Sequence, residues 1–552
     1  MSLSPSLRLC AGGLLLLASL TACRRDDALQ VHGVRVQLDK AAAQPVSGRL
    51  LVFAIPVAEA RAQAKEGKVD KVDTSPFMPT QVSVAAMEVN HVAPGASVVV
   101  DTGALAFPAA FSKLKAGEYA MQAVLDVNHD YNYGGRGAGD VVSEVTTVRL
   151  GDGAVPSLTL VRALPGASGP SWELPADAPQ QVRDEAAAAR AHAEPLDFVS
   201  PALSAFWGRP MHIRGWVLLP PDYAADRESC YPTVYYTHGF SGKLSHLIAD
   251  VASMDKRMRN GQMPPMIWVF LDESSATGTH EFADSVNNGP WGTALTAELI
   301  PDLEERYRMD ARASGRFLTG HSSGGWATLW LQVAYPKVFG GTWSTSPDPS
   351  DFTDFTGPDI YAKDANVYRK PDGKAWPLVR DKGEVKATFE EFARLERVLG
   401  PYGGQMASFE WVFSPRGDDG RPVPLFDRET GRVDPAVAAY WREHYDIAHR
   451  LRTQWPALKA DLDGKIHVIV GDADTFYLDG PARRLKATLE SLGAKTDVRF
   501  LPGRSHFDLY VEGDDRRALS SRIAWEMYAV ARPDAPKPSK ERAPSDAVPA
   551  TR

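Results

Sequence analysis

Hydrophobic and polar positions follow two different patterns in the two halves of the chain. Between residues 24 and 165, short apolar runs that partly alternate with polar positions are separated by turn residues, as at 29–38, 48–55 and 119–125. Alternation with a period of two is typical of strands that bury one face. We therefore predict a small all-β, sandwich-like domain over 24–165.

From residue 196 to residue 532, compact apolar runs alternate with stretches of helical periodicity, such as 293–306. Strands that alternate with helices require a mostly parallel, doubly wound sheet, so this part is predicted to be an α/β domain. The expected strands are 211–219, 231–237, 266–271, 316–319, 341–345, 465–470 and 496–501.

Three segments depart from these patterns. Residues 166–195 are rich in Pro, Gly and Ala and then charged, which favours a linker with one short helix. Residues 347–460 separate two strands of the α/β domain by too many residues for a loop, so we predict a cap insertion over the site. Residues 533–552 are polar and rich in Pro, which is typical of a disordered tail.

The cap sequence is also rich in aromatic residues, and two helices are expected in it, at 387–399 and 436–452. A cap inserted at this point emerges at the carboxyl edge of the sheet, where ligands bind in open parallel sheets. Some of its aromatic side chains are therefore expected to line the pocket, and the others to fill the cap's own core. The candidates are Phe352, Phe355, Tyr361, Trp376, Phe409, Trp411, Phe413, Tyr440 and Trp441.

Composition and charge narrow the possible partners. The 552 residues are 44% hydrophobic and 24% charged, with a net charge of -8 and no long basic run, so nucleic acid is not expected as a partner. The three cysteines are Cys10, Cys23 and Cys230. Because two of them lie in the leader, we predict no internal disulfide framework, no metal site built on cysteines and no cofactor.

Residues 1–23 have the pattern of a processed leader. Arg8 precedes the apolar run 12–20, which is too short to span a bilayer as a stable helix. Leu20-Thr21-Ala22-Cys23 resembles the lipobox of bacterial lipoproteins, and this resemblance implies that the mature chain begins at a lipidated Cys23. Arg24 follows where inner-membrane retention usually shows Asp, which favours the outer membrane, facing the periplasm or the surface. The alternative is an ordinary secretory signal with a chance cysteine.

A short strand pattern at 316–319 leads into Gly320-His321-Ser322-Ser323-Gly324, and a helical pattern follows. Strand, Gly-x-Ser-x-Gly and helix form the nucleophile elbow of α/β-hydrolases. The two glycines let the strand and the helix pass closely, and the turn lifts the serine hydroxyl clear of the sheet edge. Ser322 is therefore the predicted nucleophile.

A serine nucleophile needs a base, and the base needs an acid that fixes its tautomer. In this fold the chain order is Ser, acid, His. Asp474 follows the strand after the cap and is the predicted acid, with Asp472 and Asp479 as rivals. His506 follows the last strand and is the predicted base.

The tetrahedral intermediate needs two N–H donors. One is expected from Ser323, directly after the nucleophile, and the other from Phe240, in the loop that follows the strand at 231–237. His238 precedes the elbow in the chain, so it is interpreted as a residue that structures this loop.

The chain resembles a family of esterases that includes enterochelin esterases, S-formylglutathione hydrolases, feruloyl and acetylxylan esterases and mycolyltransferases. The resemblance covers roughly 196–530 and implies an α/β-hydrolase with the triad Ser322, Asp474 and His506. The long cap departs from the compact members, so the substrate is not implied. The resemblance to this family rests on the motifs Leu219-Pro220, Tyr231-Pro232, His238-Gly239-Phe240, Glu298-Leu299-Ile300-Pro301, Gly320-His321-Ser322-Ser323-Gly324-Gly325, Tyr335-Pro336, Phe339-Gly340-Gly341, Gly471 to Phe476, and His506.

These observations predict a lipid-anchored serine esterase that acts on a small-molecule, glycan or siderophore-type ester through an acyl-enzyme. A peptidase or an acyltransferase with the same triad is the catalytic alternative. A surface binding lipoprotein with a vestigial triad is the alternative from another class.

One loop of the β domain has some features of a calcium-binding loop. Asp126, Asn128 and Asp130 place oxygen atoms at alternate positions, as calcium loops do. However, Tyr131 stands where an EF-hand needs Gly, and position twelve has no Glu, so a polar surface loop is the favoured interpretation.

Overall fold

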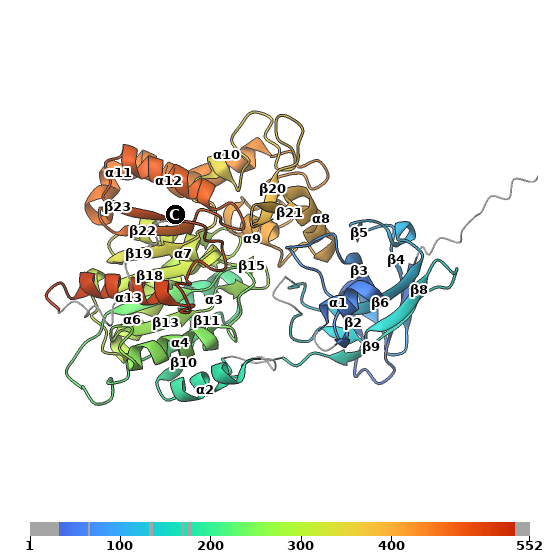
Figure 1. The fold of residues 1–552 in the computed structure, drawn as a ribbon, viewed down its shortest axis with the longest axis horizontal. Coiled ribbons are helices and arrows are strands. Elements are labelled where there is room, and N and C mark those ends of the chain that lie inside the picture. The colour runs from blue at the N-terminus through green and yellow to red at the C-terminus, as the bar shows by residue number, and fades with distance from the viewer. Residues whose placement is uncertain (1–32, 65–66, 132–135, 167–169, 175–177, 536–552) are drawn as a thin grey trace, which may run out of the picture.

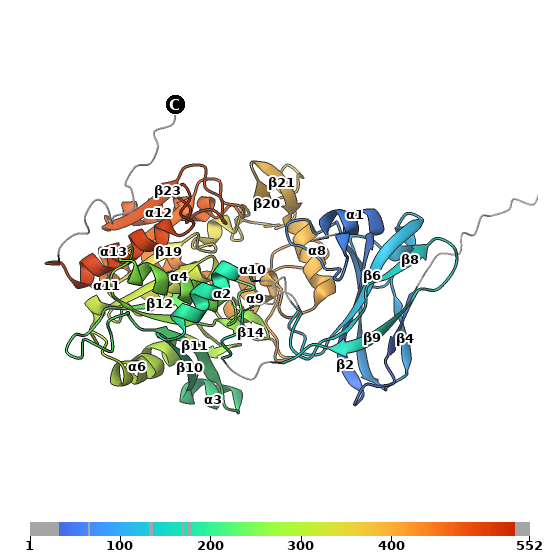
Figure 2. The same cartoon turned by 60° about the horizontal axis from the view of Figure 1, so that its bottom comes forward.

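The computed structural model describes residues 33–64, 67–131, 136–166, 170–174 and 178–535. The predicted leader with Cys23 and most of the predicted tail lie outside the described residues. Two sheets organise the chain, one of nine strands from its N-terminal part and one of eight strands from the remainder. Figures 1 and 2 show the two units side by side, with helix α8 (Phe389–Leu399) between them.

The N-terminal sheet has the strand order β4-β1-β9-β7-β6-β2-β3-β5, and β8 pairs with β6. Short helix α1 (Val57–Gln63) follows β2. The strands are β1 (Gly33–Leu38), β2 (Val46–Pro56), β3 (Ser83–Val92), β4 (Ser97–Asp101), β5 (Ala106–Phe107), β6 (Gly117–Asp126), β7 (Val141–Ser143), β8 (Thr146–Leu150) and β9 (Ser157–Ala163).

This sheet folds over on itself like a sandwich. Val36 of β1 and Val52 of β2 lie in one core although their strands are not neighbours in the sheet. Alternate residues of a strand point to opposite faces. Leu51 and Phe53 of β2 therefore face the other way, into a second core that is completed by Leu395 of α8. Both faces of β2 are thus buried, one within the domain and one under the domain's own Ala60 and Val72 together with α8 of the cap.

The second sheet has the order β10-β11-β13-β12-β18-β19-β22-β23. Within it only β11 runs against its neighbours, so the predicted fold class, a mostly parallel α/β sheet preceded by a smaller β unit, is confirmed. The strands are β10 (Ala193–Val199), β11 (His212–Leu218), β12 (Thr233–Thr237), β13 (Ile267–Leu271), β18 (Arg316–His321), β19 (Gly341–Thr345), β22 (Ile466–Gly471) and β23 (Thr496–Leu501).

Helices cover both faces of this sheet, and a hydrophobic core lies between the sheet and the helices on each face. One core takes side chains from α2, α4 and α13, and the cores of the opposite face take them from α6, α7, α11 and α12. The bounds are α2 (Gln180–Ala189), α3 (Pro201–Trp207), α4 (Leu247–Arg259), α6 (Ile300–Arg306), α7 (Ser323–Ala334), α11 (Ile447–Leu462), α12 (Asp479–Ser491) and α13 (Ala518–Ala531).

The cap consists of the β20–β21 hairpin (Pro377–Asp381 and Glu384–Thr388), α8, α9 (Gln405–Phe413) and α10 (Pro435–His444). Helix α8 begins with a capping box between Thr388 and Glu391, which satisfies its first free N–H groups. The predicted helix 436–452 is two helices, because the Asp446 carboxylate accepts from the N–H of His449 at 2.8 Å and starts α11 anew.

Other predicted bounds also shift. The predicted boundary between linker and α/β domain at 195/196 falls inside β10, and α2, within the predicted linker, buries Ala186 and Ala189 in the core of the second sheet. The predicted helix 293–306 contains a π-helical turn at Ala294–Leu299. Among the described helices, none combines the length and apolarity needed to cross a membrane.

Candidate active site

Ser322 sits at a sharp turn between β18 and α7. Its backbone has φ 60° and ψ −125°, a conformation that L-residues rarely adopt and that costs about 1–3 kcal/mol. The glycines on either side explain how the turn closes. A Cβ on Gly320 would lie 2.3 Å from the carbonyl oxygen of Gly324, and a Cβ on Gly324 would lie 2.3 Å from that of His238. Only glycine fits at both positions, so strand and helix meet directly behind the serine.

The structure places the predicted base and acid side by side. His506 Nδ1 lies 2.9 Å from Asp474 Oδ2, and the side chains are 4% and 0% exposed. Burial alone would raise the pKa of Asp474. The charge and hydrogen bond of His506, with the N–H of Phe476 at 2.9 Å, instead hold this pKa below its usual value. Asp474 is therefore a carboxylate that orients His506.

The two rival carboxylates have other partners. Asp472 accepts from the N–H of Gly503 at 2.6 Å, and Asp479 pairs with the guanidinium of Arg380 at 2.7 Å. Neither has a hydrogen bond to His506 among those of the described residues. The geometry therefore favours Asp474 as the partner of the base.

The loop after β12 passes directly against the nucleophile. A Cβ on Gly239, the residue before Phe240, would lie 3.0 Å from the Cβ of Ser322 and 3.7 Å from its Oγ. Both Phe240 and Ser322 line the same pocket. Ser323, the other predicted oxyanion donor, is buried and donates its hydroxyl to Asp348 Oδ2 at 2.6 Å, which fixes the first turn of α7.

His238 holds this loop in shape, as predicted from its position. Its Nε2 lies 2.9 Å from Asp272 Oδ1 and its Nδ1 lies 2.8 Å from the carbonyl oxygen of Gly239. Burial would lower the pKa of His238, but Asp272 and the neighbouring Glu273 raise it to about 9. A charged ring thus donates to the Gly239 carbonyl and orients the peptide that precedes Phe240.

Sequence reasoning missed a group of buried acids behind the elbow. Burial raises the pKa of Glu273 to about 8 and that of Asp348 to about 6, and it raises the pKa of Glu281 as well. Glu273 and Glu281 lie in the loop after β13, whose Ser, Thr and Asn residues are typical of a surface turn. No local signal marks these acids as buried.

His321, the variable residue of the elbow motif, was also missed as a neighbour of the base. Its ring centroid lies 4.3 Å from that of His506. Burial and the positive charge of His506 lower the pKa of His321 to about 3. His321 is therefore neutral at physiological pH and adds no competing charge beside the base.

Ser322 and His506 open onto a pocket of about 670 Å³, within the usual size of a small-molecule site. Most of the lining residues are apolar or aromatic. They come from the β unit, the α/β domain and the cap. Of the cap aromatics named above, Phe355 and Phe409 line the pocket, whereas Phe352, Phe413 and Trp441 fill the cap core. The other lining side chains of the cap and the α/β domain include Phe240, Leu378, Phe392, Met406, Phe476, Leu478 and Phe507.

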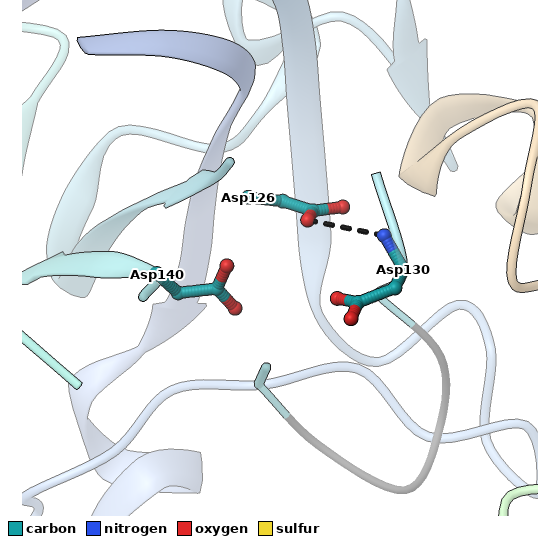
Figure 3. A group of neighbouring side chains, drawn as sticks. All are labelled: Asp126, Asp130 and Asp140. Carbon is teal, nitrogen blue, oxygen red and sulfur yellow. Dashed lines mark hydrogen bonds between the residues drawn. The ribbon is translucent and has the colours of Figure 1, made fainter. Parts of the chain in front are cut away.

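The candidate cation loop of the β unit gathers a different set of ligands from the one predicted. Asp126 and Asp130 meet Asp140, and one carboxylate oxygen from each lies within 4.8 Å of the others (Figure 3). Asn128 instead donates its amide to the carbonyl of Ala138 at 2.8 Å. Burial and the neighbouring Asp126 raise the pKa of Asp140 to about 7. The Asp126 carboxylate also accepts from the backbone N–H of Tyr131, and the Asp140 carboxylate accepts from that of Gly137.

The family that matches this chain does so over the α/β domain with its cap. The profile of a family described as "Putative esterase" matches residues 204–506, more than half of the chain, and includes all three predicted triad positions. No curated protein sequence matches the chain.

Several solved structures are similar to it. A ferulic acid esterase is 16% identical over 62% of this chain and 97% of its own, with a TM-score of 0.37. S-formylglutathione hydrolase from Agrobacterium tumefaciens is 13% identical, with coverages of 62% and 94% and a TM-score of 0.36. A ferulic acid esterase from Anaeromyces mucronatus, in complex with ferulic acid, is 14% identical, with coverages of 60% and 88% and a TM-score of 0.31.

Proposed function

Since the chain belongs to the esterase family whose profile matches residues 204–506, we propose that it hydrolyses a carboxylic ester through Ser322, His506 and Asp474. His506 removes the proton of the Ser322 hydroxyl as the oxygen attacks the ester carbonyl. The alcohol leaves with that proton, and the acyl group stays on Ser322. Water, deprotonated by His506, then cleaves the acyl-enzyme and restores the serine.

The remaining site residues support these steps. Asp474 keeps the proton on Nδ1 of His506, so that the other ring nitrogen is free to accept. The N–H groups of Phe240 and Ser323 stabilise the oxyanion, and the dipole of α7 adds to their field because the helix begins at Ser323. No step requires a metal or an organic cofactor.

One observation carries the proposal. A buried His506–Asp474 hydrogen bond lies beside a serine that a strained turn lifts into an apolar pocket. A purely structural serine would not need a conformation that costs about 1–3 kcal/mol. A binding lipoprotein with a vestigial triad is therefore the weaker alternative.

The substrate is proposed to be a small-molecule ester, and the named relatives include esterases of ferulic acid. An ester of a glycan or a siderophore is compatible with the same chemistry. An acyltransferase would use the same acyl-enzyme with an acceptor other than water, and a peptidase would use the same triad on an amide.

The protein is also proposed to be held in the cell envelope by lipids on Cys23, at the outer membrane. Support for this comes from the leader and from the lipobox-like Leu20 to Cys23. Expression of the full chain and of Cys23→Ser, followed by detergent partition and mass analysis, tests the proposal. A wild-type chain that stays in the aqueous phase without lipid mass would contradict it.

Covalent labelling with a fluorophosphonate tests the catalytic proposal. The wild-type protein should gain the mass of one probe on the peptide that contains Ser322, and Ser322→Ala should gain none. A panel of aryl, acetyl-sugar and siderophore esters with a peptide control then distinguishes the proposed catalytic activities and substrates. Labelling that is equal in both proteins would refute the assignment of the nucleophile.

A further inference from the structure

The N-terminal β unit, which lies outside the family match, reaches the active-site pocket. Thr74, Ser75, Pro76 and Phe77, in the loop before β3, line the same pocket as Ser322 and His506. This loop is separated from the nucleophile by about half of the chain. The pocket is therefore complete only when both sheets are present.

Phe77 joins a row of aromatic rings that leads to the base. Its ring centroid lies 5.5 Å from Phe507, in an edge-to-face arrangement, and 6.0 Å from Phe476. Phe476 in turn lies 4.9 Å from the ring of His506. Phe77 and Phe507 remain 37% and 64% exposed, so both rings keep free surface at the pocket. Exposed aromatic rings beside a catalytic site provide contact area for an apolar ligand.

The loop that carries Phe77 is tied down from behind. The N–H of Val72 donates to Gln122 Oε1 of β6 at 2.9 Å, and the buried hydroxyl of Tyr131 hydrogen-bonds to the Asp73 carboxylate. The loop therefore has a fixed position relative to the sheet, and Phe77 is held by the fold of the β unit as well as by its aromatic neighbours.

The sheet is in turn docked on the cap through α8. Arg49 donates to the carbonyls of Arg397 and Val398, and Leu395 lies in the core of the sheet's outer face. Phe392, on the same helix, lines the pocket. One helix thus connects the β unit and the substrate pocket.

The lining of the pocket defines the chemistry of what fits there. Among the described residues that line it, none is a lysine or an arginine, and Asp348 is acidic. A buried carboxylate or phosphate on the substrate would meet no permanent cation in this lining, whose basic groups are histidines, and burial lowers the pKa of His246 and His321. A neutral apolar group would bury its surface against the aromatic rings.

We propose that the β unit is a substrate-specificity element, whose Phe77 forms with Phe507 and Phe476 a wall that binds a bulky, neutral, apolar group of the ester. This inference rests on the proposed esterase function. It assigns to the N-terminal domain a direct role in selecting the substrate.

The test compares Phe77→Ala with Met78→Ala. Met78 is the next residue, is 49% exposed and does not line the pocket. Three esters serve as probes. Ethyl acetate has no bulky group, ethyl 3-phenylpropanoate has one on the acyl side, and 3-phenylpropyl acetate has one on the alcohol side. Rates of inactivation by a small and by a phenylalkyl fluorophosphonate give a second readout that does not depend on ester turnover.

We expect Phe77→Ala to raise KM for at least one bulky ester by about tenfold, with a much smaller change for ethyl acetate. Inactivation by the phenylalkyl probe should slow in parallel, and Met78→Ala should match the wild type. Equal effects on small and bulky probes, or equal effects of the two substitutions, would overturn the inference while leaving the triad intact. Absence of labelling at Ser322 in the wild type would overturn the proposed function itself.

Discussion

Arg49 of the N-terminal sheet donates to the carbonyl oxygen of Val398, near the end of cap helix α8, through Nε at 3.1 Å and Nη2 at 2.8 Å. The last carbonyls of a helix lack partners within the helix and carry the negative end of its dipole. A buried guanidinium from another domain satisfies them here. Glu88 pairs with the same guanidinium at 2.7 Å and balances its charge.

Replacement of Arg49 by Met should therefore loosen the contact between the β unit and the cap. We expect the loss of about 2 kcal/mol from the local free energy of opening, since hydrogen bonds to charged groups contribute about 1.5–3 kcal/mol. Hydrogen exchange of the peptides that cover α8 and β2 measures this effect. Glu88 is 53% exposed and also contacts His129, so the substitution leaves no buried unpaired charge.

Arg149→Met is the matched control, because Arg149 is exposed on β8 of the same sheet. It should leave exchange in α8 unchanged. If Arg49→Met also leaves it unchanged, the hydrogen bonds to Val398 do not contribute to docking.

Two substitutions of Ser322 distinguish its role in catalysis from the backbone strain at its position. Ser322→Ala should reduce hydrolysis of an activated ester to less than a few percent and leave the fold intact. Ser322→Gly should be equally inactive but more stable by about 1 kcal/mol, because glycine adopts positive φ without a Cβ penalty. Ester turnover and thermal unfolding measure the two effects. Substantial residual activity in either variant would refute Ser322 as the nucleophile.

The choice of acid can be tested at three carboxylates. Asp474→Asn should lower turnover by a factor on the order of 10⁴, because an amide cannot hold the imidazole in the required tautomer or stabilise its charged form. Asp472→Asn and Asp479→Asn should have far smaller effects, since those carboxylates bind Gly503 and Arg380. A larger loss at Asp472 than at Asp474 would reverse the assignment.

The pH dependence of activity should show the titration of His238. Its pKa rises from 6.5 to about 9 in the folded protein, so the stabilisation by the charged ring is complete below pH 6.5 and is lost as the pH rises through about 9. Loss of that charge leaves one ring N–H for two acceptors, Asp272 and the Gly239 carbonyl, and so loosens the hold on the oxyanion loop. We expect kcat to fall above pH 9 in a profile measured from pH 6 to 10.5.

Asp272→Asn should move this alkaline fall to lower pH, because the substitution removes the charge that raises the pKa of His238. The matched control is Asp497→Asn, which removes the carboxylate near His467, 3.8 Å away, on the distant edge of the sheet. An alkaline limb that does not shift with Asp272→Asn would exclude His238 as its source.

Much of the second domain could be predicted from the sequence because its strands are short, buried and bounded by turns. β19 and β23 begin and end at the predicted residues, and the order Ser, acid, His in the chain led to three residues that the structure places around one pocket or next to it. These features depend on local pattern and on the chain order of the fold. Local pattern also predicted α8, to within a few residues.

Features that depend on distant contacts could not be predicted. β3 lacks clear alternation, and its existence depends on pairing with β2. The burial of Glu273 and Glu281 depends on the cap, whose Ser408 lies against the same loop and accepts from the N–H of Thr279 at 2.8 Å. The approach of Phe77 to the pocket requires two sheets to be placed relative to each other, and no periodicity encodes that placement.

The docking of the β unit on α8 also sets an order of assembly. Arg49 and Val398 are 349 positions apart, so the core on the outer face of β2 lacks its α8 side chains until the chain has been made beyond residue 399. An apolar core that waits for part of its cover is prone to aggregation and slows the final closure. During synthesis, this incomplete core is therefore a site at which a chaperone can protect the molecule.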